Sequence, residues 1–380
     1  MTLHEVENCH KIISMKIAII GASTGQLPLC HKAKESGFET ICFAWPQNAI
    51  CKNHVDRFYP ISILEKDIIL EICREEKIVG VVSNGSDLTA EVASYISTKL
   101  DLHGIDYESF LQIKDKSKVR FLTRDINELS QVRTFSFNED SEYPFPCVVK
   151  PKIGSAKKGV SYVQNKSELA RVAKELGTYS VDDIMIEEYI EGHEVSVETL
   201  SFESNHYVIQ ITDKENSGTP HFVELSHHQP SQLPETIKEK IKRIVPSLLN
   251  TIGVANGATH IEMKIKDENV FLIEINPRGG GGEISNRLVE LSTGFDYITA
   301  MINVAVGMFT PPVVKNTHYA GIYFICLQTK DRLPFFLKLD NQDWLVEKCF
   351  DANRPLTEAT GNHDRNGYFI YQSSHKVTIQ

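Results

Sequence analysis

Residues 260–282 read HIEMKIKDENVFLIEINPRGGGG, and this stretch carries the clearest structural information in the chain. Apolar and polar residues alternate on either side of the polar residues 267–269, which predicts a β-hairpin. A three-residue loop centred on Glu268 places Glu262 directly opposite Glu274. Two opposed carboxylates repel each other. The pattern therefore predicts a cation between these two side chains.

The residues that follow Glu274 extend the same chemistry. Asn276 shares the face of Glu274, and two carboxylates with an amide oxygen are hard ligands suited to Mg²⁺ held with nucleotide phosphates. Arg278 can neutralise a phosphoryl group in bidentate fashion. The four glycines 279–282 let backbone N–H groups approach an anion closely. We predict a metal and phosphate site here; the alternative is an exposed charged hairpin followed by a flexible loop.

A second informative segment, residues 147–160, reads CVVKPKIGSAKKGV. Lys150 closes an apolar strand, and a loop with Gly154 and Ser155 leads to a return strand at Gly159. This arrangement resembles a lid over phosphates, although the P-loop pattern G-x-x-x-x-G-K-[ST] is absent. Taken alone, the segment fits an ordinary basic hairpin equally well.

A third segment, residues 184–198, reads IMIEEYIEGHEVSVE. A strand leads through a hinge and a Gly turn into another strand. The backbone of such a hinge can meet an adenine edge, and Glu194 suits ribose hydroxyls. Taken alone, the segment is only a hairpin that bears acids.

Together and in this order, the three segments resemble the ATP-grasp superfamily of carboxylate–amine ligases over about residues 15–310. The resemblance implies ATP and Mg²⁺ (or Mn²⁺) as cofactors. It implies nucleotide contacts at Lys116 (with Lys118 as a rival), Lys150, Gly154, Ser155, Gly159, Glu187, Glu188, Tyr189, Ile190 and Glu194. It implies metal ligands at Glu262, Glu274 and Asn276, and a catalytic group formed by Glu274, Asn276 and Arg278. In this group Arg278 stabilises an acyl phosphate.

Residues 221–230 read HFVELSHHQP, and they are similar to a stretch of the dipeptide-forming L-amino acid ligases. This similarity implies substrate contacts at Glu224, His227, His228, Arg278, Gly280 and Gly281. The implied reaction joins a carboxylate to an amine with release of ADP and phosphate, on amino-acid-like substrates. The carbamoyl-phosphate synthase large subunit is also similar, so a bicarbonate-activating reaction stays open, as does a non-catalytic ATP-binding sensor.

Two further segments are candidate substrate contacts, each with a plain structural turn as the alternative. Residues 83–87, SNGSD, close a predicted strand, where open α/β sheets place ligands. Arg365 lies in a predicted turn at residues 361–367. The Gly21–Gly25 turn, GASTG, does not complete a dinucleotide-binding fingerprint.

The order of predicted elements gives an α/β and α+β fold class. Strand and helix signals alternate over the first hundred residues, which predicts a parallel sheet. Later strands are predicted as antiparallel pairs: Cys147–Lys150 with Gly159–Val163, Ile184–Glu188 with Val195–Leu200, and Thr259–Ile265 with Val270–Ile275. The predicted units are an extension (1–14), a parallel α/β domain (15–110), a lid subdomain (111–190), a large subdomain (191–310) and a β-rich segment (311–380).

Composition narrows the class of protein. The chain has 380 residues, 41% hydrophobic and 24% charged, with a formal net charge of −10. The excess of acidic over basic residues disfavours nucleic acid as a partner. No apolar run reaches the roughly 18 residues of a membrane span. The eight cysteines form no CxxC pair, and residues 1–14 lack the apolar core of a signal peptide, so we expect a cytoplasmic protein with reduced thiols. The family resemblance implies a homodimer.

Overall fold

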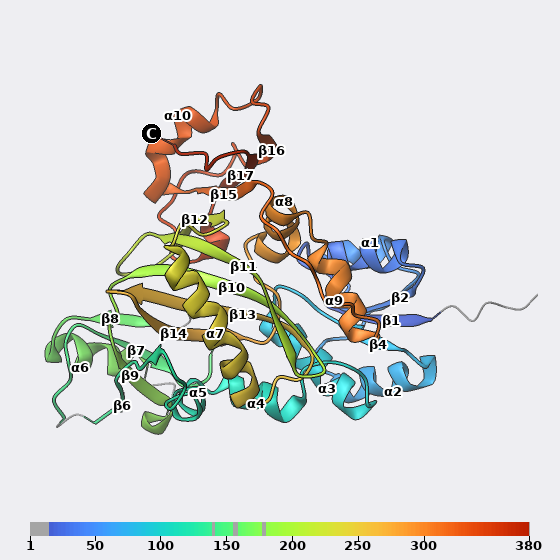
Figure 1. Cartoon of the computed structure of the whole chain (residues 1–380), viewed down its shortest axis with the longest axis horizontal. Coiled ribbons are helices and arrows are strands. Elements are labelled where there is room, and N and C mark those ends of the chain that lie inside the picture. Colours follow the sequence, from blue (N-terminus) through green and yellow to red (C-terminus); the bar gives the residue numbers. More distant parts are fainter. Residues whose placement is uncertain (1–14, 139–140, 155–158, 177–179, 380) are drawn as a thin grey trace, which may run out of the picture.

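The computed structural model describes residues 15–138, 141–154, 159–176 and 180–379. This part of the chain forms two four-stranded sheets and one nine-stranded sheet, with helices packed on them (Figure 1). The predicted fold class, a parallel α/β unit followed by α+β units, is confirmed. The predicted extension, residues 1–14, lies outside the described residues.

The N-terminal sheet is parallel throughout, as predicted. Its strands lie in the order β3 (Arg57–Tyr59), β2 (Glu39–Phe43), β1 (Lys16–Ile20) and β4 (Gly80–Val82). Helix α1 (Leu27–Glu35) connects β1 to β2, α2 (Lys66–Glu76) connects β3 to β4, and α3 (Asp87–Lys99) follows β4. Alternate residues of β1 enter two different apolar clusters, so both faces of the sheet are covered, as is typical of parallel sheets. The short strand β3 was missed by the sequence analysis.

The small sheet contains the predicted lid hairpin. Its strands lie in the order β6 (Thr134–Ser136), β9 (Ile184–Glu188), β7 (Cys147–Pro151) and β8 (Ser161–Val163), with helix α6 (Lys166–Glu175) beside them. The predicted pairing of β7 with β8 is confirmed.

One predicted pairing in this region is wrong. Strand β9 pairs with β6 and β7, whereas the strand that follows it belongs to the nine-stranded sheet. The two strands cannot pair with each other because the residues between them cross from one sheet to the other. The predicted hinge is therefore the connection between the two sheets.

The nine-stranded sheet forms the centre of the molecule. Its strands lie in the order β16 (Leu345–Phe350), β17 (Gly367–Ser373), β15 (Tyr319–Ile325), β12 (Glu224–Gln229), β11 (Asn205–Asn216), β10 (His193–Phe202), β13 (Gly257–Lys266), β14 (Asn269–Asn276) and β5 (Leu129–Ser130). Helix α7 (Glu235–Thr251) lies across one face (Figure 1). Its apolar side, including Ile241, Ile244 and Leu248, belongs to the same buried cluster as Val195 and Val197.

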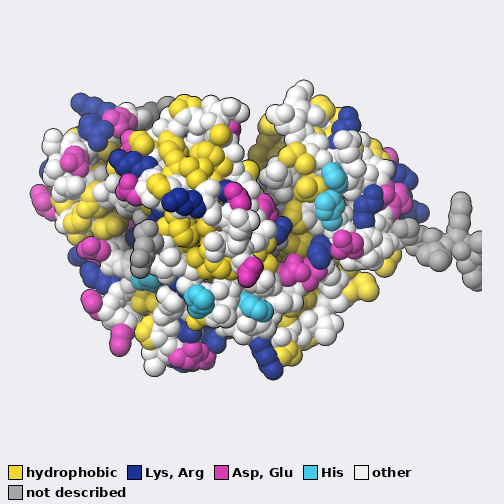
Figure 2. All heavy atoms as spheres, turned by 90° about the horizontal axis from the view of Figure 1, so that it is seen from above, with side chains coloured by type: hydrophobic (Ala, Val, Ile, Leu, Met, Phe, Trp, Pro, Cys, Tyr) yellow, Lys and Arg dark blue, Asp and Glu magenta, His cyan; other side chains and the backbone are white. Residues whose placement is uncertain are grey.

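The remaining α-helices lie in the connections between strands. They are α4 (Tyr107–Lys114), α5 (Lys116–Leu122), α8 (Val289–Thr293), α9 (Tyr297–Ala305) and α10 (Leu333–Phe336). Strand β15 pairs with β12, so the C-terminal segment extends the nine-stranded sheet. Seen from above, a groove separates the lobe of the N-terminal sheet from the rest of the molecule, and acidic and basic side chains are interspersed on that surface (Figure 2). Within the described ranges, no helix has the length and hydrophobicity needed to cross a membrane.

The β13–β14 hairpin places Glu262 opposite Glu274, as predicted. The predicted three-residue loop is wrong, because the turn has only two residues, Asp267 and Glu268, both with positive φ. A β-bulge between Glu262 and Met263 then shifts the register by one residue. The tight turn and the bulge together restore the opposition of the two carboxylates.

Candidate active site

A cavity of about 150 Å³ lies between the small sheet and the nine-stranded sheet. Ten residues singled out from the sequence line it: Lys116, Lys150, Gly154, Glu187, Glu188, Tyr189, Ile190, Glu194, Glu262 and Glu274. The other lining residues, which the sequence analysis missed, are mostly apolar: Val132, Val148, Pro151, Val160, Phe222, Lys264 and Ile273. Apolar walls with a few convergent charged groups are the usual composition of a small-molecule site.

Lys150 and Glu187 form a buried ion pair in this cavity, with Nζ and Oε2 2.6 Å apart. Arg120 completes the group, since its Nε lies 2.7 Å from Glu187 Oε1 and its Nη2 donates to the Ile273 carbonyl. Burial raises the pKa of Glu187, but the two neighbouring cations outweigh it and lower this pKa to about 2. Arg120, which approaches from helix α5, is not indicated by any sequence pattern.

Lys116 and Lys118, the two candidates for the first nucleotide lysine, lie in different surroundings. Lys116 lines the cavity, and its Nζ lies 3.1 Å from Glu274 Oε1 and 2.8 Å from the Gly154 carbonyl oxygen. Lys118 is exposed on α5. The predicted lid residue Ser155 lies outside the described residues. Gly159 does not line the cavity, but a side chain there would meet Pro151, which does.

Aromatic rings gather at the hinge end of the cavity. The Tyr189 ring lies 4.9 Å from that of Tyr162 and 6.1 Å from that of Phe222. Lys264 Nζ lies 4.9 Å from the centre of the Tyr189 ring and donates to the Ile190 carbonyl. Aromatic side chains at this end of the cavity provide apolar contacts that suit a planar ring system.

Lys214 connects three of the predicted ligand carboxylates. Its buried Nζ lies 2.7 Å from Glu262, 2.8 Å from Glu224 and 3.6 Å from Glu194. Burial lowers the pKa of Lys214, but the three carboxylates outweigh it and raise it well above its ordinary value. Lys214 is not indicated by any sequence pattern. It reaches Glu194 of β10 and Glu224 of β12 because its own strand, β11, lies between these two strands.

A second charged group holds the glycine-rich turn. Glu198 Oε2 accepts a hydrogen bond from the Gly280 N–H at 3.0 Å, and Glu198 Oε1 lies 2.5 Å from His260 Nδ1. Burial lowers the pKa of His260, but Glu198 and Glu262 outweigh it and raise it to about 9. A methyl group at position 280 would lie within 2.9 Å of Glu198 and His260, so only glycine fits at this position without a shift of its neighbours. Gly281 faces open space.

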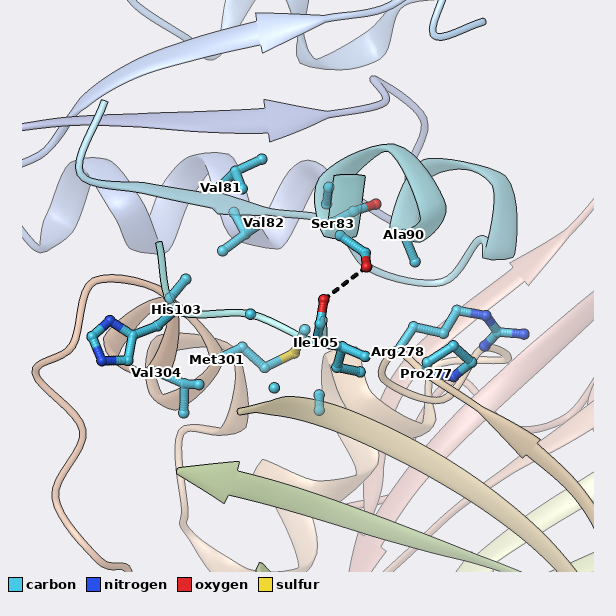
Figure 3. Close-up of a pocket in the computed structure, with 16 residues that line it drawn as sticks. Val81, Val82, Ser83, Ala90, His103, Ile105, Pro277, Arg278, Met301 and Val304 are labelled. Atoms are coloured by element: carbon cyan, nitrogen blue, oxygen red, sulfur yellow. Dashed lines mark hydrogen bonds between the residues drawn. The ribbon is translucent and has the colours of Figure 1, made fainter. Parts of the chain in front are cut away.

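Arg278 turns toward the N-terminal lobe. Its Nε is hydrogen-bonded to the Asp87 carboxylate, and its Nη1 donates to the Gly279 carbonyl at 3.1 Å. The residue borders a second, smaller cavity of about 70 Å³ between α3, α9 and β13 (Figure 3). The predicted segment 83–87 therefore reaches the site through Asp87 and through Asn84, whose Nδ2 donates to Ser285 Oγ.

The two neighbouring histidines of strand β12 face opposite sides of the sheet. A bulge between Glu224 and Ser226 puts Glu224 and His227 on the side of Lys214. His227 Nε2 lies 3.4 Å from Glu224 Oε2, and burial lowers the pKa of His227. His228 was expected beside them but points away, because successive strand residues alternate, and its Nδ1 is hydrogen-bonded to the Tyr371 hydroxyl.

The donor set of the predicted metal site fits a hard divalent cation. Glu262 and Glu274 are directly opposed and both line the cavity, and Asn276 follows on the same strand. Each carboxylate has a lysine within 3.1 Å, Lys214 or Lys116. The acids are therefore already neutralised by cations, as a pair of opposed carboxylates requires, and their oxygens are the type that Mg²⁺ prefers.

Comparison with known proteins agrees with this geometry. A family model described as "ATP-grasp domain" matches residues 143–287. This part of the chain is therefore similar to the ATP-grasp domain. The match includes every residue that lines the larger cavity except Lys116 and Val132. The resemblance inferred from the sequence is confirmed.

The individual proteins to which the chain is similar are distant in sequence. The chain is 28% identical over 245 residues to the uncharacterized protein y4rH of Sinorhizobium fredii, covering 60% of this chain and 49% of that protein. It is 24% identical over 298 residues to the carbamoyl phosphate synthase large chain of Clostridium acetobutylicum, covering 75% of this chain and 27% of that protein. The chain thus spans about half and about a quarter of these relatives. The structure of L-amino acid ligase from Bacillus licheniformis has the same fold, with a TM-score of 0.78, 22% identity, and 95% and 94% of the two chains covered.

Proposed function

We propose that this chain is an ATP-dependent ligase that joins a carboxylate to an amine through an acyl phosphate, releasing ADP and phosphate. We further propose that its substrates resemble amino acids. One observation carries the proposal: residues from three separate sequence segments line one cavity, with Glu262 opposite Glu274 at its edge. The likeness to the L-amino acid ligase fold supports the substrate class.

The proposed nucleotide site uses the cavity residues in two ways. Lys116 and Lys150 hold phosphate oxygens, and the backbone of residues 188–190 meets the adenine edge. Glu187 was expected to contact adenine, but its carboxylate is engaged by Arg120 and Lys150. We therefore assign Glu187 the role of holding Lys150 in place. Glu194 meets the ribose.

The proposed transfer site lies at the end of β14, where Glu274 is opposite Glu262 of β13. Glu262, Glu274 and Asn276 would hold Mg²⁺, which supplies charge neutralisation between the phosphates. The substrate carboxylate attacks the γ-phosphorus and ADP leaves. Arg278 and the Gly280 turn then stabilise the resulting acyl phosphate. This role requires Arg278 to release or share Asp87, its partner in the present structure.

The amine substrate would bind on the side of Glu224 and His227. Burial lowers the pKa of His227, so its imidazole is neutral near pH 7 and can accept the proton that the attacking amine loses. Attack of the amine nitrogen on the acyl carbon forms the amide, and the bond to phosphate breaks. The protein mainly positions the reactants and neutralises charge, so no covalent enzyme intermediate is needed.

Product analysis tests this proposal. The purified chain is incubated with Mg-ATP and pools of amino acids, bicarbonate and small carboxylic acids, and ADP, AMP and phosphate are measured. ADP and phosphate that appear only with a carboxylate and an amine support the ligase. ADP release with bicarbonate would instead favour carbamoyl-phosphate-type chemistry, whereas AMP would contradict the acyl phosphate.

The matched variant for this assay is Glu274→Gln, compared with Glu268→Gln in the exposed hairpin turn. We expect Glu274→Gln to lower ADP formation at least about 100-fold, because a charge interaction of several kcal/mol is lost and each 1.36 kcal/mol changes a rate tenfold. Glu268→Gln should leave the rate within about twofold. Full ATP turnover by Glu274→Gln would refute the assignment.

A further inference from the structure

Arg365 differs from every other arginine of the chain in its partners. The chain has twelve arginines, and eleven of them form an ion pair with a carboxylate. Among the residues that the structure describes, Arg365 has no such partner. Its Nε donates to the Asn362 carbonyl at 2.8 Å and its Nη1 to the Glu224 carbonyl at 3.3 Å. Its Cζ lies 3.6 Å from the centre of the Phe324 ring.

Several hydrogen bonds fix the conformation of the turn that contains Arg365. The Asp364 carboxylate accepts hydrogen bonds from the N–H groups of Thr360 and Gly361, each at 2.9 Å. The Asn366 side-chain amide donates to the Arg354 carbonyl at 3.0 Å. The guanidinium is therefore held in one orientation, with its planar face on an aromatic ring, before any ligand arrives.

The surroundings of Arg365 belong to the proposed substrate site. Phe324, on which the guanidinium stacks, also packs edge-on against His227, with ring centres 5.4 Å apart. His227 in turn lies against the glycine turn, with its Nδ1 3.2 Å from the Gly282 carbonyl oxygen. The buried His227 Nε2 makes no hydrogen bond within the described part of the chain. Arg365 and His227 thus both lie beside Glu224: Arg365 donates to its carbonyl, and His227 Nε2 lies 3.4 Å from its Oε2.

We propose that Arg365 binds a non-reacting carboxylate of the amine substrate, so that this substrate is an amino acid and the product keeps a free carboxylate. The inference rests on the proposed ligase function. A guanidinium matches a carboxylate in bidentate geometry. The reacting carboxylate must lie at the phosphates near Lys116 and Glu274, which line the cavity, whereas Arg365 is not among the lining residues. Arg365 contacts the Glu224 backbone, and the Glu224 side chain pairs with Lys214, which also pairs with Glu262. The carboxylate at Arg365 is therefore a second one.

A binding measurement tests the proposal without depending on turnover. With Mg²⁺ and a non-hydrolysable ATP analogue present, we would titrate pooled L-amino acids and, separately, the same pool as α-carboxamides, and follow the affinity by calorimetry. The variants are Arg365→Met and Arg365→Lys. The matched control is Arg332→Met, because Arg332 also stacks on a ring, Tyr323 at 5.3 Å, but pairs with Glu215 on the opposite face of the sheet.

We expect the wild type to bind the carboxylate pool about 10- to 100-fold more tightly than the amide pool, the range for a hydrogen bond to a charged group. Arg365→Met should abolish this preference, Arg365→Lys should restore part of it, and Arg332→Met should keep it. Equal affinity of the wild type for both pools, or an unchanged preference in Arg365→Met, would overturn the proposal. Binding of the nucleotide analogue without binding of either amino-acid pool would also overturn the proposal for Arg365. If ADP were then released with other pairs of a carboxylate and an amine, the ligase function would still stand.

Discussion

Replacing Glu187 by Gln should destabilise the protein, because it leaves two buried cations without their shared carboxylate. The side chains of Glu187, Lys150 and Arg120 are 5%, 8% and 9% exposed. Glutamine keeps the shape of the side chain and removes only its charge. Lys150 and Arg120 would then repel each other in a region with little solvent screening.

The magnitude follows from the pKa of Glu187. The shift from 4.5 to about 2 corresponds to about 3 kcal/mol at 1.36 kcal/mol per pH unit. This agrees with the about 3–5 kcal/mol lost when one partner of a buried ion pair is removed. With an unfolding entropy of about 2.1 cal/mol/K per residue over 380 residues, the melting temperature should fall by about 4 °C.

Thermal and denaturant unfolding measure this loss, with Glu188→Gln as the control. Glu188 pairs with Arg133, which is 63% exposed, so its loss should cost at most about 1 kcal/mol. Because the folded-state pKa of Glu187 lies below its unfolded value, its contribution is complete above about pH 4.5 and is lost as the pH falls toward 2. The difference between wild type and Glu187→Gln should shrink over that range. Equal small losses in both variants at pH 7 would refute the reasoning.

Two further predictions concern the glycine turn and the first nucleotide lysine. Gly280→Ala should lower the free energy of unfolding by about 1–3 kcal/mol, because the added methyl group meets Glu198 within 2.9 Å. Gly281→Ala is the control and should leave this free energy unchanged, because position 281 faces open space. Equal thermal stability of the two variants would contradict the packing argument. Lys116→Met should weaken ATP binding by about 10- to 100-fold, the loss of a hydrogen bond to a charged group, whereas Lys118→Met should change it less than about twofold. Calorimetric titration with ATP measures both, and a larger effect at Lys118 would reverse the assignment.

Local sequence patterns were sufficient to predict much of the site. The alternation around residues 262 and 274 predicted two opposed carboxylates, although a tight turn and a bulge produce the opposition. No local pattern indicated Lys214, Arg120 or Glu198, because each reaches the site by lying next to elements that are distant in the sequence. Lys214 does so through the order of strands in the nine-stranded sheet, and Arg120 does so through helix α5.

The same limit explains why two of the expectations differ from the structure. His228 was grouped with His227 from their adjacency, but adjacent residues of a strand face opposite sides. The strand ending at Glu188 was paired with the next strand along the chain, whereas the pairing of β9 with β6 and β7 is non-local. Local periodicity identifies elements, while their neighbours depend on the packing of the whole chain. The predicted domain boundaries stay predictions.

Transfer of ¹⁸O from the substrate carboxylate to phosphate tests the central claim most directly. A substrate pair found in the ADP assay would be supplied with both carboxylate oxygens labelled, and the released phosphate analysed by mass spectrometry. An acyl phosphate places one labelled oxygen in each phosphate and leaves ADP unlabelled. Unlabelled phosphate, or label recovered in AMP, would contradict the proposed mechanism.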